Sequence, residues 1–248
     1  MHLIKEDGFY DPWGIYLCND YLPWDEYLEL EKTFPEFKKV ESLHTSFNDG
    51  YSAVSVSAFN EKLLLTEKWE EFVKYHISKK YFLRMFNNFG DIWKTWRPEL
   101  LEKITSEDFT MGHVRSKVDM KDIPKSEHPD IAYEFLFVHD CERMNRDGLH
   151  VHIDRYDKLI QSMIYFRHPE DECNDANLQL HHCHQWGNYF PGTIDKKIDY
   201  ISNRSVTLPF TPTAYHSVSP GDRTGNPYTR KMVNIIFRVR PDLHELER

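Results

Sequence analysis

The feature that most constrains this chain is a series of short β-type segments after Ile123 with no helical segment between them. They are rich in β-branched and aromatic residues, and several alternate between apolar and polar positions. Turn-forming Gly, Pro, Asn and Asp separate them at 145–148, 169–174, 191–192 and 220–226. Such a series predicts a sandwich or barrel. The expected strands are 131–138, 149–153, 159–166, 178–184, 205–210 and 232–239.

The first half of the chain has helical periodicity instead. An amphipathic pattern covers 24–34, helix-like segments dominate 60–104, and the longest of these runs from 68 to 86. Arg97-Pro98 is typical of a helix start. We therefore expect an α+β fold with a jelly-roll (double-stranded β-helix) core. In this interpretation 1–123 is mainly helical support, 124–248 is the core, and together they form one structural unit.

Composition narrows the class of protein. Hydrophobic residues make up 40% of the 248 residues, enough for a substantial core. The 31 Lys and Arg against 40 Asp and Glu give a net charge of −9, which makes nucleic acid an unlikely partner. No apolar run approaches ~20 residues, so we expect no membrane span. The four cysteines form no CxxC pair, which is typical of a reduced, cytoplasmic protein.

One short motif points to chemistry. In His152-Ile153-Asp154 the His and Asp share one face of the expected strand, because strand residues i and i+2 point the same way. They could bind one metal, and His216 is the best candidate for a third ligand. Two His and one carboxylate leave adjacent coordination positions open, the arrangement of non-haem Fe(II) oxygenases. Taken alone, His152 is more often a half-buried strand histidine than a ligand.

Other candidates are weaker. His128-Pro129-Asp130 and His168-Pro169-Glu170 both contain a central Pro, which marks a strand edge or turn. The run 181–184 (His-His-Cys-His) lacks the usual spacing of zinc ligands, so a substrate contact is the better interpretation. His150 shares the face of His152 and could replace it or touch substrate. Loop residues near the expected mouth are further candidates: Arg143, Trp186 and Tyr189.

The wider pattern of 152–239 resembles the 2-oxoglutarate/Fe(II)-dependent oxygenase superfamily, especially its prolyl-hydroxylase-like branch. That branch shows HxD, a strand ending in Tyr, an apolar strand reaching a Phe-Pro-like turn, a distal His followed by a small residue and Val, and a basic residue opening the last strand. Here these elements are His152-Ile153-Asp154, 159–165 ending at Tyr165, 206–210, His216-Ser217-Val218 and Arg230 before 231–237. The segment 19–23 (Asn-Asp-Tyr-Leu-Pro) with Phe34-Pro35 also resembles the entry segment of such enzymes.

The resemblance implies a role for each matching residue. His152, Asp154 and His216 would bind Fe(II). Arg230 would pair with the distal carboxylate of 2-oxoglutarate, and Tyr165 would donate its hydroxyl to the same carboxylate. The loop between His216 and Arg230 is a few residues longer than usual, which leaves Arg223 and Lys231 open as alternatives to Arg230.

The implied activity is that of a dioxygenase that uses O2 and 2-oxoglutarate to hydroxylate a C–H bond, releasing succinate and CO2. Related halogenases carry Gly or Ala at the carboxylate position, so Asp154 favours hydroxylation. The substrate would be a small molecule or an amino-acid residue of a peptide. Two alternatives stay open: a cupin-like metal enzyme without 2-oxoglutarate, and a non-catalytic jelly-roll binding module.

Overall fold

The computed structural model describes residues 9–10, 14–35, 45–46, 51–55, 65–113, 128–140, 148–154, 157–173, 176–185, 188–211, 214–221 and 226–240. For 9–10, 45–46, 51–55, 140, 182–185 and 188–193 only the backbone is described.

The larger of two sheets has nine strands in the order β1-β2-β11-β8-β13-β6-β4-β3, with β5 pairing parallel to β6. Its longest pairing joins β13 to β6 over nine residues, from Lys231 opposite His139 to Val239 opposite Ile131. The strands are β1 Phe9–Tyr10, β2 Ile15–Cys18, β3 Thr45–Ser46, β4 Tyr51–Ser55, β5 Met111–His113, β6 Ile131–Asp140, β8 Lys158–Tyr165, β11 Ser205–Pro209 and β13 Lys231–Val239.

The smaller sheet has four antiparallel strands in the order β10-β9-β12-β7. They are β7 Leu149–His152, β9 Leu178–Gln185, β10 Asn188–Ile198 and β12 His216–Val218. Consecutive strands from β6 to β13 therefore alternate between the two sheets, apart from the β9–β10 pair.

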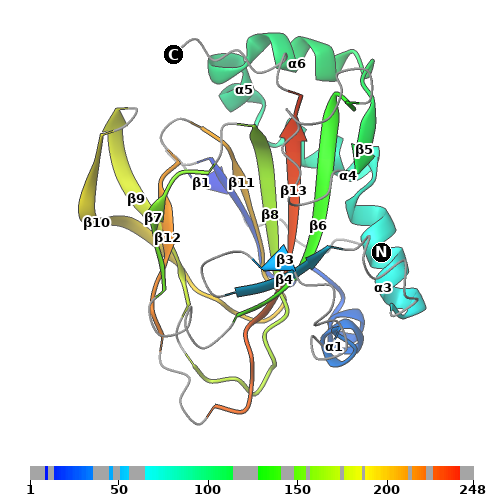
Figure 1. Cartoon of the computed structure of the whole chain (residues 1–248), viewed down its shortest axis with the longest axis vertical. Helices are drawn as coiled ribbons and strands as arrows, with labels where there is room; N and C mark the ends of the chain where they lie inside the picture. The colour runs from blue at the N-terminus through cyan, green and yellow to red at the C-terminus, as the bar shows by residue number, and fades with distance from the viewer. Residues whose placement is uncertain are drawn as a thin grey trace.

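The two sheets enclose an apolar interior. One buried cluster contains Leu136 of β6, Met163 of β8 and Ile236 of β13 from the larger sheet, with Leu180 of β9 and Ile198 of β10 from the smaller. Figure 1 shows the smaller sheet on the left and the central strands of the larger sheet to its right. Successive strand residues point to opposite faces, so each strand of the larger sheet has an inner and an outer set of side chains.

Helices cover the outer face of the larger sheet (Figure 1). Trp69 of α3 packs edge-on against Phe137 with ring centroids 5.0 Å apart, and Phe82 of α4 lies 5.1 Å from Phe237. These rings belong to a second, aromatic-rich core cluster. The described residues contain five helices: α1 Trp24–Lys32, α3 Glu67–His76, α4 Lys79–Asn87, α5 Gly90–Trp96 and α6 Pro98–Thr105.

The expected helix at 68–86 is wrong as a single element. The structure has two helices there, α3 and α4, because Ser78 adopts an extended conformation between them. The Ser78 hydroxyl accepts a hydrogen bond from the backbone N–H of Tyr81 at 3.2 Å and so caps α4. The helix starts expected near Trp24 and at Arg97-Pro98 are confirmed by α1 and α6.

The six expected strands are confirmed within one or two residues at each end. The turn expected at 191–192 is wrong, because both residues lie inside β10. There the β9–β10 pairing shifts register between Tyr189 and Ile194, and such a bulge accommodates Pro and Gly within a strand. The first half also contributes β1 to β5 to the larger sheet, in addition to its helices.

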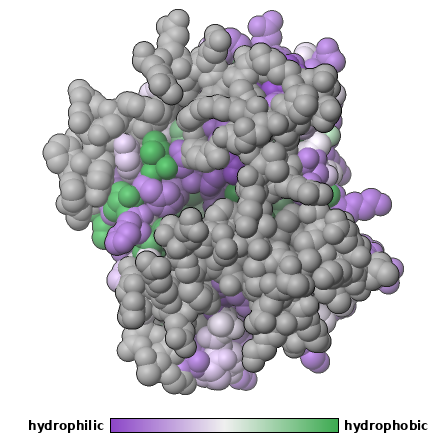
Figure 2. Space-filling model, viewed as in Figure 1, coloured by the Kyte–Doolittle hydropathy of each residue, from purple (hydrophilic) through white to green (hydrophobic). Residues whose placement is uncertain are grey.

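Part of the described surface is visible in Figure 2, where it is mostly hydrophilic, with hydrophobic residues gathered in a small group at the left. Among the described residues no helix is long and apolar enough to span a membrane.

Candidate metal centre

Strands β7 and β12 bring two distant histidines together. They pair antiparallel, with His152 directly opposite His216. The chain enters β7 at Gly148, whose φ of +69° is in the left-handed region. A Cβ at this glycine would lie 2.4 Å from the backbone oxygen of Val218, so only glycine permits the approach of the two strands. The close pairing places the expected ligand from β12 beside the HxD motif.

His152, Asp154 and His216 form a compact triad. One ligand atom from each lies within 4.8 Å of the other two. The Nε2 atom of His216 is 3.9 Å from Oδ2 of Asp154, and the two imidazole centroids are 4.3 Å apart. Within the described part of the chain, no other group of three His, Cys, Asp or Glu side chains has this geometry.

Backbone carbonyls orient both imidazoles. Nδ1 of His152 is 2.8 Å from the carbonyl oxygen of His150, and Nδ1 of His216 is 3.0 Å from that of Ala214. Each Nδ1–H therefore donates a hydrogen bond to a carbonyl oxygen. The lone pair of each Nε2 atom is then the one that could bind a metal. His150 acts here through its backbone, and its own side chain is exposed and lies outside the triad.

The electrostatics keep the triad in the protonation state that a metal requires. Burial alone would raise the pKa of the Asp154 carboxyl. The Lys158 ammonium and the two imidazoles have the larger, opposite effect and hold this pKa well below its usual range. Burial lowers the pKa of His216 to about 4, despite the opposing effect of Asp154. At neutral pH the triad is thus a carboxylate with a neutral His216, ready to coordinate.

This donor set fits Fe(II). Two imidazole nitrogens and one carboxylate oxygen on one side of a metal leave adjacent positions for a chelating ligand and O2. The interior beside the triad also contains a buried polar group that could bond a polar ligand. Asn234 lies on the inner face of β13 and is 6% exposed, and its Oδ1 atom has no hydrogen-bond partner among the described residues.

Arg230 and Tyr165 lie deeper in the interior. Arg230 is only 1% exposed, with its guanidinium carbon 5.8 Å from the ring centre of Tyr165 and 5.0 Å from that of Tyr200. Lys231 lies on the opposite face of the sheet, where its Nζ is 2.9 Å from Oε1 of Glu31 in α1. Arg223 lies outside the described residues. The structure therefore brings Arg230 and Tyr165 together and separates Lys231 from them.

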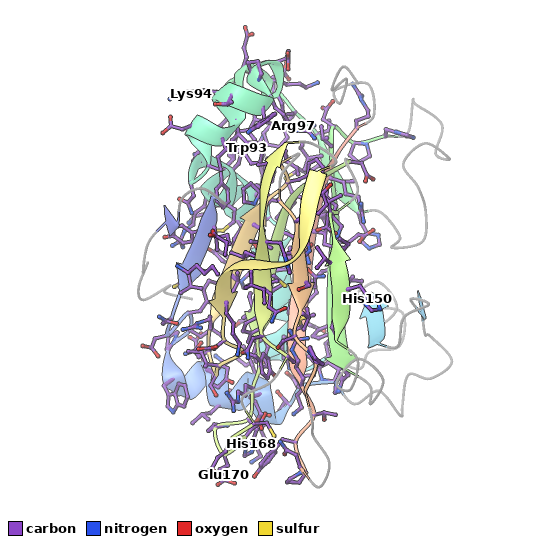
Figure 3. The ribbon with its side chains drawn as sticks, turned by 90° about the vertical axis from the view of Figure 1, so that its left-hand side faces the viewer. Trp93, Lys94, Arg97, His150, His168 and Glu170 are labelled. Atoms are coloured by element: carbon purple, nitrogen blue, oxygen red, sulfur yellow. The ribbon has the colours of Figure 1, made fainter. Side chains whose placement is uncertain are left out.

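The weaker candidate motifs serve other contacts. Asp130 binds Lys103 at 2.8 Å and Arg240 at 3.3 Å, away from the triad. His168 stacks on Tyr228, and the Tyr228 hydroxyl donates a hydrogen bond to Glu170. His168 and Glu170 lie at the end of the molecule opposite α5 (Figure 3). The Nε2 atom of His181 is 2.7 Å from the Ser217 hydroxyl. Candidates whose side chains lie outside the described residues are Arg143, His182, Cys183, His184, Trp186 and Tyr189.

Sequence reasoning missed Lys158. Its ammonium lies 2.6 Å from Oδ1 of Asp154 and 3.2 Å from Oε1 of Gln161, all beside a pocket that also reaches His216. The available signal was a lysine four residues after the motif aspartate, at the start of the next strand. A charged residue at a strand start is common on protein surfaces, and only the fold turns this one toward the triad.

Comparison with solved structures identifies the fold. A prolyl-4-hydroxylase from Pseudomonas putida aligns with a TM-score of 0.51 and 11% identity, covering 92% of this chain and 94% of that one. A prolyl 4-hydroxylase from Phytophthora capsici aligns with a TM-score of 0.52 and 9% identity, covering 95% of this chain and 62% of that one. Neither the protein-family models nor the curated proteins give a match.

These similarities confirm, at the level of the fold, the resemblance indicated by the sequence. The chain has the fold of the prolyl-hydroxylase branch of the Fe(II)/2-oxoglutarate oxygenases.

Proposed function

We propose that this protein is an Fe(II)- and 2-oxoglutarate-dependent oxygenase that hydroxylates a C–H bond of a small molecule or an amino-acid residue. In this proposal the two facing sheets form a double-stranded β-helix, supported by the alternation of strands β6 to β13 between the sheets. Strands β2 and β4 from the first half pair with β11 and β6, which favours one oxygenase domain.

One observation carries the proposal. Two imidazoles and a carboxylate, held by β7 and β12, converge within 4.8 Å with each imidazole Nδ1 fixed by a backbone carbonyl. His152, Asp154 and His216 would hold Fe(II). When bound, the iron would supply the activation of O2 that couples decarboxylation of 2-oxoglutarate to oxidation of the substrate.

The chain's own residues bind and orient the co-substrate. Arg230 would pair with the distal carboxylate of 2-oxoglutarate, which is disfavoured in a dry interior without a charge partner. The Tyr165 hydroxyl would donate to the same carboxylate. The aromatic rings of Tyr165 and Tyr200 pack beside the guanidinium, and all three side chains are buried.

Titration under anaerobic conditions tests the proposal. The protein should bind one equivalent of Fe(II), or of the redox-inert Mn(II), and then one equivalent of 2-oxoglutarate only when metal is present. On admitting O2, the Fe(II) protein should release succinate slowly without substrate and faster with a true substrate. Metal binding without metal-dependent 2-oxoglutarate binding would favour a cupin-like enzyme, and no metal binding would favour a binding module.

A further inference from the structure

A pocket borders the triad on the side of β8, and Lys158 and Gln161 supply hydrogen-bond donors to its lining. Asp154 and His216 form one edge, and Lys158 and Gln161 of β8 lie next to them. The remaining wall is apolar and includes Ile15 and Leu208. Asp154 is the only acidic residue among the described residues that line the pocket.

Lys158 and Gln161 are arranged so that donors remain. The ammonium uses one N–H for Oδ1 of Asp154 at 2.6 Å and one for Oε1 of Gln161 at 3.2 Å. An ammonium has three N–H donors, so one is left after the contacts with the described residues. Because the oxygen of Gln161 accepts from Lys158, its amide nitrogen is a further donor. An acceptor-rich, negatively charged group complements this pair.

Metal binding would strengthen the attraction for an anion. Without metal, the charges of Lys158 and Asp154 compensate each other across 2.6 Å. A dication bound at Oδ2 would share the carboxylate charge, which leaves positive charge in excess at Lys158. The Lys158 side chain is 15% exposed, so this excess is only weakly screened by water.

We propose that this pocket binds the carboxylate of a small, otherwise apolar substrate through Lys158 and Gln161. The inference rests on the proposed oxygenase function and names its substrate class. Oδ1 of Asp154 touches Lys158 and Oδ2 lies 3.9 Å from Nε2 of His216, so Oδ2 would be the metal-binding oxygen and the substrate carboxylate would lie only one carboxylate width from the metal. The carbon that is oxidised therefore lies within a few bonds of the substrate carboxylate.

Paired ligands test the proposal. Protein loaded with Zn(II) and 2-oxoglutarate is titrated with aliphatic and aromatic monocarboxylic acids of four to eight carbons and with their primary amides, which differ mainly in charge. Affinity is read by ligand-observed NMR or calorimetry. The wild type should bind at least one acid about tenfold or more tightly than its amide, the effect of a charge-assisted hydrogen bond. Lys158→Met should remove this preference.

Lys94→Met is the matched control. Lys94 carries the same charge on α5 in Figure 3, where it makes an exposed ion pair with Asp91 at 2.8 Å. This variant should keep the preference for acids. If Lys158 served only to position Asp154, the Lys158→Met protein would bind metal more weakly but would keep the ratio of acid to amide affinities.

Three results would overturn the inference. In the first, no acid is preferred over its amide in the wild type. In the second, the preference survives in Lys158→Met, which means that Lys158 does not bind the substrate carboxylate. In the third, Lys158→Met loses 2-oxoglutarate while Arg230→Met keeps it, so the pocket holds the tail of the co-substrate. Metal and 2-oxoglutarate binding by the wild type, measured first, stand in all three cases, which separates these failures from a failure of the proposed function.

Discussion

The two faces of the larger sheet carry different chemistry, and β13 shows the difference within one strand. Of its outer residues, Val233, Ile235, Phe237 and Val239 are apolar and belong to the aromatic-rich core under the helices, while Lys231 at the start of the strand pairs with Glu31 of α1. Its inner residues alternate with them and include polar and charged side chains: Met232, Asn234, Ile236 and Arg238, with Arg230 just before the strand. Strand alternation thus gives most of the apolar packing to one face, and in the proposed function it gives ligand binding to the other.

The apolar part of the outer face keeps a buried histidine neutral. His76 is fully buried there, and burial lowers its pKa to about 3, so it stays neutral and accepts a hydrogen bond from Tyr21 at 2.7 Å. The inner face tolerates charge by pairing it. Arg238 bonds Asp157 at 3.1 Å and Glu134 at 3.3 Å, all three buried. A face that holds paired charges and polar groups can bind an ionic ligand at lower desolvation cost than an apolar one.

The largest expected effect is on the inner side. Asp154→Ala should reduce metal binding and metal-dependent 2-oxoglutarate binding to background, because the only carboxylate of the triad is lost. The fold should persist, since the triad lies at the edge of the interior. Calorimetric titration with Mn(II) and a thermal melt of the metal-free protein measure both. Asp91→Ala, which removes an exposed carboxylate, is the control, and unimpaired metal binding by Asp154→Ala would contradict the site.

Arg230→Ala should weaken 2-oxoglutarate binding by about 3–5 kcal/mol, since it leaves a buried carboxylate without its charge partner. That is a loss of roughly a hundredfold to several thousandfold in Kd. Metal affinity should be unchanged. Lys231→Ala changes the neighbouring residue on the outer face and should leave 2-oxoglutarate affinity intact. The reverse pattern would show that the two faces are assigned wrongly.

Phe237→Ala should act on stability instead. Phe237 is fully buried on the outer face against Phe82, and deleting such a ring costs about 3–5 kcal/mol. Urea unfolding measures the change, and Phe237→Leu, which keeps most of the apolar volume, should cost less than about 1.5 kcal/mol. At a temperature where both variants are folded, the affinity for 2-oxoglutarate should equal that of the wild type. A selective loss of affinity would break the division between the faces.

Tyr165→Phe should weaken 2-oxoglutarate binding by about 1–3 kcal/mol, the contribution of one hydrogen bond to a charged group. The ring that packs against Tyr200 is retained, so the melting temperature should hardly change. Titration of the metal-loaded variant measures the affinity. An affinity equal to that of the wild type would place the Tyr165 hydroxyl outside the co-substrate site.

The pH dependence of stability tests the dry outer face. The pKa of His76 is about 3 in the fold and about 6.5 when unfolded, so between these values the unfolded chain binds more protons. Stability should therefore fall as pH drops below about 6.5, by about 2 kcal/mol at pH 5 from this residue. Urea unfolding at pH 7 and pH 5 measures the change, and the free energy of unfolding should fall less for His76→Gln than for the wild type. An identical loss would mean that His76 is protonated in the fold.

Several parts of the fold follow from neighbouring residues. The alternation at 232–239 predicts a strand with two distinct faces, and the spacing of His152 and Asp154 predicts that they share a face. The break between α3 and α4 was missed because Ser78 caps a helix only when the chain turns there, and a continuous amphipathic pattern gives no sign of that turn. The strand β10 was missed because Pro191 and Gly192 normally end strands, and only a bulge against β9 accommodates them.

The sequence by itself determined the motif, the residue types of the donor set and the resemblance to an oxygenase family, because these depend on residue types and their order along the chain. Only the tertiary structure decided that β12 pairs with β7, that Lys231 points to α1 while Arg230 lies within, and that Lys158 contacts Asp154. Strand pairing and register depend on hydrogen bonds and packing between distant segments, and a shift of one residue would turn every side chain to the opposite face.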